Sequence, residues 1–136
     1  MNNNNLKLQK AFSLIELIFV IAILGIIATI AVPKLLNSRS SAVVTTIKQD
    51  ISTITTAIQS QYMLNGSIDK ITDTVTINEK NWKVEDKKLV YDIDGKDCVT
   101  IEVTTNSLVV TIKEKSSSLC QKLYDSGIRN ITYDLI

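Results

Sequence analysis

The longest apolar stretch of this chain lies near the N-terminus. No charged residue occurs between Glu16 and Lys34, and residues 17–33 read LIFVIAILGIIATIAVP. At about 1.5 Å per residue, a helix of this length covers most of a hydrocarbon core roughly 30 Å thick. The pattern therefore predicts a helix that lies in a membrane at some stage in the life of the protein.

A second pattern follows, in which apolar residues recur every three or four positions. Such spacing places them on one face of a helix, and no Gly or Pro interrupts the chain between Pro33 and Gly66. We expect one helix from about Ser13 to Asn65, with a kink at Gly25 and Pro33 because proline lacks an amide hydrogen. The stripe consists of Val44, Ile47, Ile51, Ile54, Ile58 and Tyr62.

Beyond residue 66 the apolar positions alternate with polar ones, which is typical of half-buried strands. The alternating segments are Ile71–Ile77, Leu89–Ile93, Val99–Val103, Leu108–Ile112 and Ile131–Ile136. Asp94-Gly95 is a turn signal, and the serines at 116–118 precede a short helix that Gly127 closes. The predicted fold is α+β: a long N-terminal helix, transmembrane in its first half, packed against a small C-terminal antiparallel sheet.

Composition limits the chemistry that the chain can perform. Its 136 residues include 15 basic and 14 acidic residues, which fits one modest domain without a general positive field for nucleic acid. There is no histidine, so imidazole catalysis and zinc sites made of His and Cys alone are excluded. No catalytic constellation is visible, and no direct nucleic-acid binding is evident.

The polar segment before the apolar stretch resembles the lead-in of an export signal. Residues 1–10, MNNNNLKLQK, carry Lys7 and Lys10 and no acid, which favours a cytoplasmic N-terminus. Lys34 and Arg39 flank the other end, so charge counts alone leave the orientation nearly balanced.

Two ordinary readings of this region are a cleaved secretory signal, cut after Ala31, and a permanent signal anchor. Neither accounts for Glu16, a carboxylate inside the apolar block. A charge at the middle of a bilayer costs on the order of 3 kcal/mol on insertion scales. Glu16 therefore indicates a specific partner.

Lys10 and Ala11, followed by FSLIEL at 12–17, resemble the processing site of the type IV pilin and pseudopilin family. The resemblance covers residues 7–35 and implies cleavage between Ala11 and Phe12 by a membrane aspartic peptidase, followed by N-methylation of Phe12. The family's conserved glutamate falls on Glu16 and its helix-kinking proline on Pro33. This chain has Ala11 where the family usually has Gly before the cut.

The resemblance implies four parts: a leader (1–11), a transmembrane and polymerisation helix (12–33), the amphipathic half of that helix (34–66) and the sheet region (67–136). It implies a structural subunit and not an enzyme, which forms a helical polymer with itself and with related minor subunits. Its other partners would be the prepilin peptidase and methyltransferase, an inner-membrane assembly platform with its ATPase, and membrane lipid before assembly.

Physical reasoning supplies an assembly mechanism for such a subunit. Cleavage converts the amide nitrogen of Phe12 into an ammonium, which in a packed filament can lie beside Glu16 of a neighbouring subunit. In a core of low dielectric constant that pair is favoured and an unpaired charge is strongly penalised. Once extracted from the bilayer, the apolar block is driven to bury against copies of itself.

Three functions remain open at this stage. The mature length of 125 residues, 12–136, and the lack of an extended variable loop favour a pseudopilin of a type II secretion or DNA-uptake system. The second is a major or minor pilin of a surface type IV pilus, and the third is a permanently anchored periplasmic binding module. The first two place the precursor in the bacterial inner membrane, as a single pass with a cytoplasmic N-terminus, and the product in a periplasmic or cell-surface filament.

Cys98 and Cys120 enclose 21 residues of the sheet region. An exported chain meets oxidising conditions, which favours a disulfide, and pilins commonly carry a disulfide near the C-terminus. Two buried thiols and a redox pair are the alternatives.

The sequence predicts no cofactor, with one alternative to consider. Asp92, Asp94 and Asp97 place carboxylates close together, as hard cations such as calcium prefer. Lys96 lies inside this segment and the order of ligands is not that of an EF-hand. A solvated turn is the favoured interpretation and a calcium ion the alternative.

Overall fold

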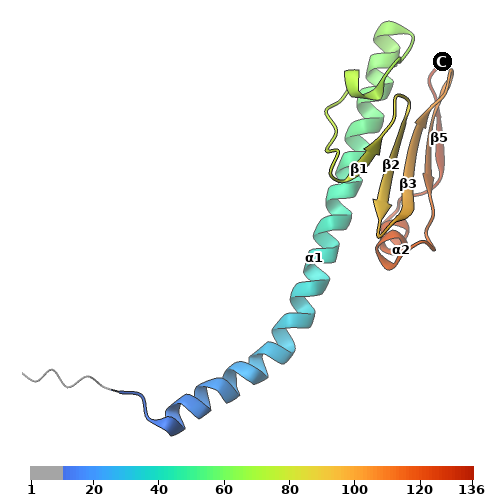
Figure 1. Ribbon diagram of the computed structural model, residues 1–136. Helices are drawn as coiled ribbons and strands as arrows, with labels where there is room; N and C mark the ends of the chain where they lie inside the picture. Colours follow the sequence, from blue (N-terminus) through green and yellow to red (C-terminus); the bar gives the residue numbers. More distant parts are fainter. Residues whose placement is uncertain (1–10) are drawn as a thin grey trace, which may run out of the picture. The chain divides into compact units, whose positions relative to one another are not determined.

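A computed structural model describes residues 11–136 of the chain, and Figure 1 shows the order of their elements. The contacts divide the chain after Arg39 into an N-terminal segment and a compact unit, Ser40–Ile136. The elements are α1 (Leu14–Asn65), the 3-10 turn η1 (Ile71–Asp73), β1 (Trp82–Val84), β2 (Lys88–Ile93), β3 (Lys96–Val103), β4 (Ser107–Ile112), α2 (Ser118–Asp125) and β5 (Ile131–Asp134).

The predicted single long helix is confirmed. α1 has 52 residues and is assigned without a break through Gly25 and Pro33, so the kink expected there stays a prediction. The helix ends where the sequence indicated: Gly66 has a φ of 71°, and its N–H donates to the carbonyl of Tyr62 at 2.7 Å. Glycine adopts this left-handed conformation without the steric penalty that a Cβ brings.

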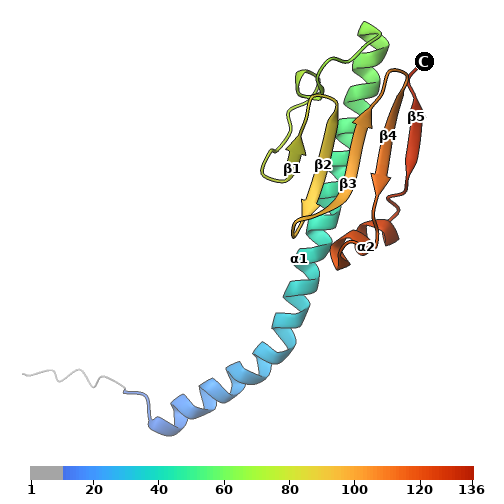
Figure 2. The same cartoon turned by 45° about the vertical axis from the view of Figure 1, so that its right-hand side comes forward.

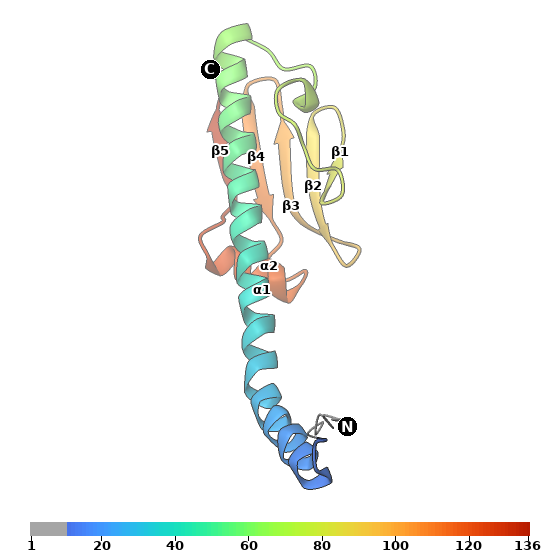
Figure 3. The ribbon, with the colours of Figure 1, turned by 90° about the vertical axis from the view of Figure 1, so that its left-hand side faces the viewer.

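The sheet is an antiparallel meander of five strands in the order β1-β2-β3-β4-β5. The part of α1 that belongs to the compact unit lies across one face of the sheet, as Figures 2 and 3 show from two sides. The α+β fold expected from the sequence is therefore confirmed.

The core lies between this half of α1 and the sheet. Ile47 and Ile58 of the helix are almost fully buried, as are Leu89 and Leu108 of the strands and Leu123 of α2. Full burial of such a side chain contributes about 1.5–3 kcal/mol, which offsets the poor helix propensity of the many threonines in α1.

The strand predicted at Ile71–Ile77 is wrong. Ile71 begins the 3-10 turn and is fully buried, and its carbonyl accepts hydrogen bonds from the N–H groups of Thr74 and Val75. The alternating residues thus fold back on themselves, and Val75 and Ile77 pack against the edge of the core. A short apolar alternation fits either arrangement, because periodicity does not record whether a strand partner is within reach.

The first strand, β1, was not predicted. It has only three residues, pairs with β2 in the register Trp82↔Tyr91, and buries Trp82 to 2% exposure. The two aromatic rings meet edge to face at 5.1 Å, and the indole Nε1 donates to the Asp50 carboxylate of α1 at 3.2 Å. Trp82 thereby anchors the edge strand to the helix.

The other turns and elements agree with the sequence. Asp94 and Gly95 have φ angles of 53° and 77°, the pattern of a type I′ turn between β2 and β3. Ser117 caps α2 by accepting a hydrogen bond from the N–H of Cys120 at 3.1 Å. The last strand is shorter than predicted and ends at Asp134.

The predicted disulfide is confirmed. Cys98 of β3 and Cys120 of α2 are bonded, with 5.7 Å between their Cα atoms, and both are buried. The bond ties the short helix to the middle of the sheet, so the two alternatives, separate thiols and a redox pair, do not describe this state.

Candidate assembly site at the N-terminal helix

The start of α1 is fixed by a serine cap. The Oγ of Ser13 accepts a hydrogen bond from the N–H of Glu16 at 3.3 Å, and the Ser13 carbonyl accepts one from Leu17 at 3.1 Å. A serine followed three residues later by glutamate is a known helix-start pattern, and it is present in the sequence as SLIE. Our sequence reasoning missed this role of Ser13, although the signal was available.

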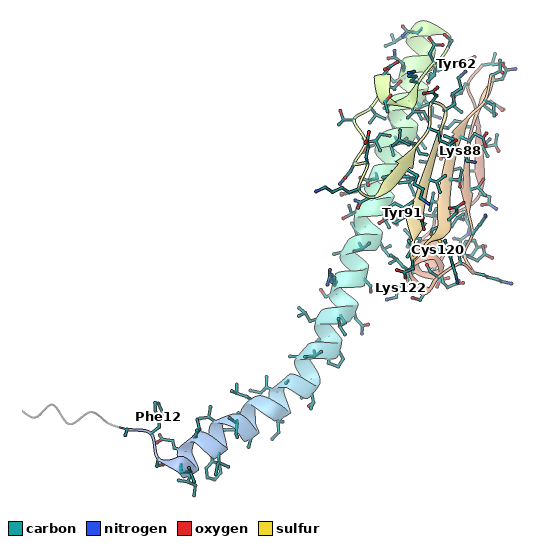
Figure 4. The ribbon with its side chains drawn as sticks, viewed as in Figure 1. Phe12, Tyr62, Lys88, Tyr91, Cys120 and Lys122 are labelled. Carbon is teal, nitrogen blue, oxygen red and sulfur yellow. A yellow bond between two sulfur atoms is a disulfide. The ribbon has the colours of Figure 1, made fainter. Side chains whose placement is uncertain are left out.

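The predicted cleavage site lies directly before this cap. Ala11 and Phe12 are exposed and outside any regular secondary structure. Figure 4 shows Phe12 ahead of the first turn of α1. An exposed peptide bond outside regular secondary structure is accessible to a protease active site. The remainder of the predicted leader, including Lys7 and Lys10, lies outside the described residues.

The N-terminal half of α1 presents apolar side chains around its whole circumference. Leu14 is 79% exposed, as is Phe12 just before the helix, and an 18-residue window of the helix has a mean hydropathy of 2.8 with none of it buried. By length and composition α1 is able to cross a membrane. The other large exposed side chains of this half are Ile15, Leu17, Ile18, Phe19, Val20, Ile21, Ile23, Leu24, Ile26, Ile27, Ile30, Val32, Leu35 and Leu36.

Exposure of this kind cannot persist in water. Burial of apolar surface is worth about 25 cal/mol per Å², so this half of the helix requires lipid or other protein around it. The stripe of the second half behaves differently, because its members are already covered by the sheet. One continuous helix therefore has an exposed apolar surface in its first half and an apolar stripe covered by the sheet in its second half.

Glu16 is the acidic residue of the first helical turn, and its side chain is exposed. A negative charge is favourable there because the N-terminus of a helix carries partial positive charge. Within residues 11–136 no cation lies within salt-bridge distance of it; the ion pairs of this part of the chain are Lys70–Asp86 and Lys83–Asp92. The carboxylate is therefore available to a cation that the described part of the chain does not supply.

The three aspartates considered for calcium are not gathered into one cluster in the described residues, and a calcium ion there stays an alternative. No group of three or more His, Cys, Asp or Glu side chains between residues 11 and 136 is placed to hold a metal ion. Asp92 is paired across the strands, with its Oδ2 at 2.5 Å from the Nζ of Lys83, while Asp94 occupies the tight turn. The hydrogen bond and the charge of Asp92 raise the pKa of Lys83 above its ordinary value, and Asp97 adds to this.

Stability is expected to fall in alkaline solution because of Tyr91. Burial, aided by the negative charge of Asp50, raises the pKa of its phenol above the ordinary value of 10.0. The unfolded chain then loses this proton at lower pH than the folded chain, so the native state is destabilised as pH rises through that range. Melting temperatures of the wild type should decrease between about pH 9 and about pH 11, and Tyr91→Phe should decrease less. An equal decrease in both proteins would contradict this assignment.

The sequence matches known proteins in both of its halves. Residues 6–32 match the family model of the prokaryotic N-terminal methylation motif. The type IV major fimbrial protein FimA of Dichelobacter nodosus is 29% identical over 129 residues, which are 95% of this chain and 65% of that protein. A fimbrial protein of Pseudomonas aeruginosa is 32% identical over 118 residues, 83% of this chain and 74% of the relative. This chain belongs to the type IV pilin family. No solved structure matches this pilin.

Membership of this family accounts for the exposed apolar half of α1 and for the methylation motif at its start. Type IV pilins are structural subunits and not enzymes; prepilin peptidase processes them, and they polymerise into filaments. The apolar helix and the methylation motif of this pilin fit a precursor held in a membrane and a product held in a filament.

Proposed function

We propose that this pilin is a subunit of a surface type IV pilus, cleaved between Ala11 and Phe12 and assembled through the N-terminal half of α1. The observation that carries the proposal is the exposed apolar N-terminal half of α1, whose carboxylate, Glu16, has no cation within salt-bridge distance in the described chain. The relatives named fimbrial proteins support the pilus rather than another type IV filament.

Cleavage acts as the assembly switch in this proposal. Before it, the nitrogen of Phe12 is an uncharged amide. Afterwards it is an ammonium, and N-methylation preserves its charge. When the apolar helices pack together, Glu16 of one subunit pairs with the Phe12 ammonium of its neighbour. A stagger that separated the two groups would leave buried charges unpaired, so the pair also sets the axial register.

Mass spectrometry of the mature N-terminus tests the processing step. We expect a peptide that starts with N-methyl-Phe12 from filaments sheared off cells, and immunogold labelling along fibres on the cell surface. An intact Met1 in the native protein, with only dispersed single molecules, would instead indicate a permanently anchored binding module and would contradict the proposal.

The second candidate is a pseudopilin, because the loops between β2, β3 and β4 are tight. Deletion of the gene separates the two. Loss of surface fibres with unchanged protein secretion and DNA uptake supports the pilus. Loss of secretion or of transformation, in cells whose surface fibres are unchanged, supports the pseudopilus.

A further inference from the structure

A groove of about 290 Å³ lies between α1 and the edge strand β5, within the compact unit. Its apolar lining includes Ile51 of the helix and Ile131 and Tyr133 of the strand. Ile131 remains 41% exposed, so the inner face of β5 is only partly covered. Sequence reasoning did not find this groove, because three segments distant along the chain line it.

The two walls of the groove, α1 and β5, run in the same chain direction. Near one end, the Nζ of Lys48 donates to the carbonyl of Ser126 at 2.9 Å, just before β5 begins. Near the other, the hydroxyl of Tyr62 donates to the carbonyl of Thr105 at 3.2 Å, beside the turn that faces the end of β5. Figure 4 shows Tyr62 and Lys122 toward opposite ends of the sheet. The groove therefore has a defined beginning, on the side of Lys48, and a defined end.

Positive charge is concentrated at the beginning of the groove. Lys48 and Arg129 both line it, no acidic residue does, and neither cation is in an ion pair within residues 11–136. Arg129 is held in place: its guanidinium stacks on the ring of Tyr124 at 3.8 Å, and its Nη1 donates to the carbonyls of Tyr124 and Ile128. Its other N–H groups remain for an acceptor, and a carboxylate matches a guanidinium in shape and charge.

Strand β5 is an open edge of the sheet, with β4 as its only neighbour in the described chain. The N–H of Leu135 donates to the carbonyl of Asn106 directly opposite, at 2.9 Å. In an antiparallel ladder every second residue bonds to the same neighbour, so Tyr133 and Ile131 also face β4. The backbone N–H and C=O groups of Thr132 and Asp134 then point outward, ready to pair with another strand.

We propose that an extended peptide with a free C-terminal carboxylate adds to the open edge of β5. It runs antiparallel to β5, so that its carboxylate lies between Lys48 and Arg129 at the beginning of the groove. Its apolar side chains on the inner face contact Ile51 and Ile131. Backbone pairing supplies affinity, and the two cations select for the end of a chain.

Binding to the full-length protein in detergent micelles tests the proposal. The probe is a pool of N-acetylated pentapeptides in which threonine alternates with varied apolar residues, prepared either with free carboxylates or as C-terminal amides. We expect the free acids to be retained and the amides to bind at least about tenfold more weakly. Lys48→Ala and Arg129→Ala should each cause a loss of similar size, whereas Lys115→Ala, which lies outside the groove, should cause none.

The edge pairing has its own test. Thr132→Pro removes an N–H that points away from β4, so it should leave the ladder intact while it abolishes peptide binding, and Thr132→Ala should bind normally. Equal retention of acids and amides, or binding unaffected by Lys48→Ala and Arg129→Ala, would overturn the proposal. Binding that survives Thr132→Pro and is displaced equally by acetate would show a simple anion site instead. If Thr132→Pro does not fold, the comparison of acids with amides still decides.

Discussion

Glu16→Gln is expected to leave membrane insertion and leader cleavage intact while it reduces the yield of sheared filaments at least about tenfold. The substitution keeps the size of the side chain and one carbonyl acceptor, and it replaces the charged oxygen with an uncharged NH2 donor. In the proposed filament it would leave the Phe12 ammonium buried without a partner, and breaking a buried pair in this way costs about 3–5 kcal/mol. Immunoblots of sheared and cell-bound fractions, with the mass of the mature N-terminus, measure both outcomes.

Two matched variants identify the cause of such a loss. Glu79→Gln removes the charge of an exposed glutamate from the loop before β1 and should assemble normally. Glu16→Asp keeps the charge on a shorter side chain and should assemble better than Glu16→Gln. A normal filament yield from Glu16→Gln would show that the carboxylate is not part of the assembly interface.

Removal of the disulfide is expected to destabilise the compact unit by about 3 kcal/mol, because the bond closes a loop of intermediate length in the unfolded chain. For a domain of this size that loss lowers the melting temperature by roughly 12–24 °C. The double variant Cys98→Ala/Cys120→Ala, followed by circular dichroism, measures it. Alanine is preferred to serine because both sulfur atoms are buried, and a hydroxyl there would add a cost of its own.

A reduced wild-type sample provides the control for this measurement. It retains both sulfur atoms and lacks only the covalent bond, so its loss of stability should approach that of the double variant. A change below about 1 kcal/mol in both would mean that the unfolded chain is not restrained as the entropy argument requires.

Most elements of the fold could be predicted from patterns in the sequence. The long helix was predictable because its period, its glycine cap and its uninterrupted length are all local properties. Strands β2, β3 and β4 were predictable for a similar reason, since each is bounded by turn residues such as Asp94 and Gly95. The strand prediction at Ile71–Ile77 was wrong because its alternation is equally consistent with a turn that packs on the core. Strand β1 was not predicted because three residues are too few to show a period.

Most of the candidate assembly site could also be predicted from the sequence. The block from Leu17 to Pro33, the carboxylate at Glu16 and the bond before Phe12 are contiguous, so their relationship follows from chain geometry alone. What the structure added is that α1 begins at Leu14 behind a Ser13 cap, and that within the described chain nothing covers the apolar half or pairs with Glu16.

The sequence alone determined the extent of α1, the apolar character of its first half and the position of the Glu16 carboxylate in that half. Each of these depends on residues close together in the chain. The tertiary structure alone decided which strands lie at the two edges of the sheet, that Trp82 reaches Asp50, and that Lys48 and Arg129 line one groove. Those residues are far apart in sequence, and only the packing of the helix on the sheet brings them to one place in the fold.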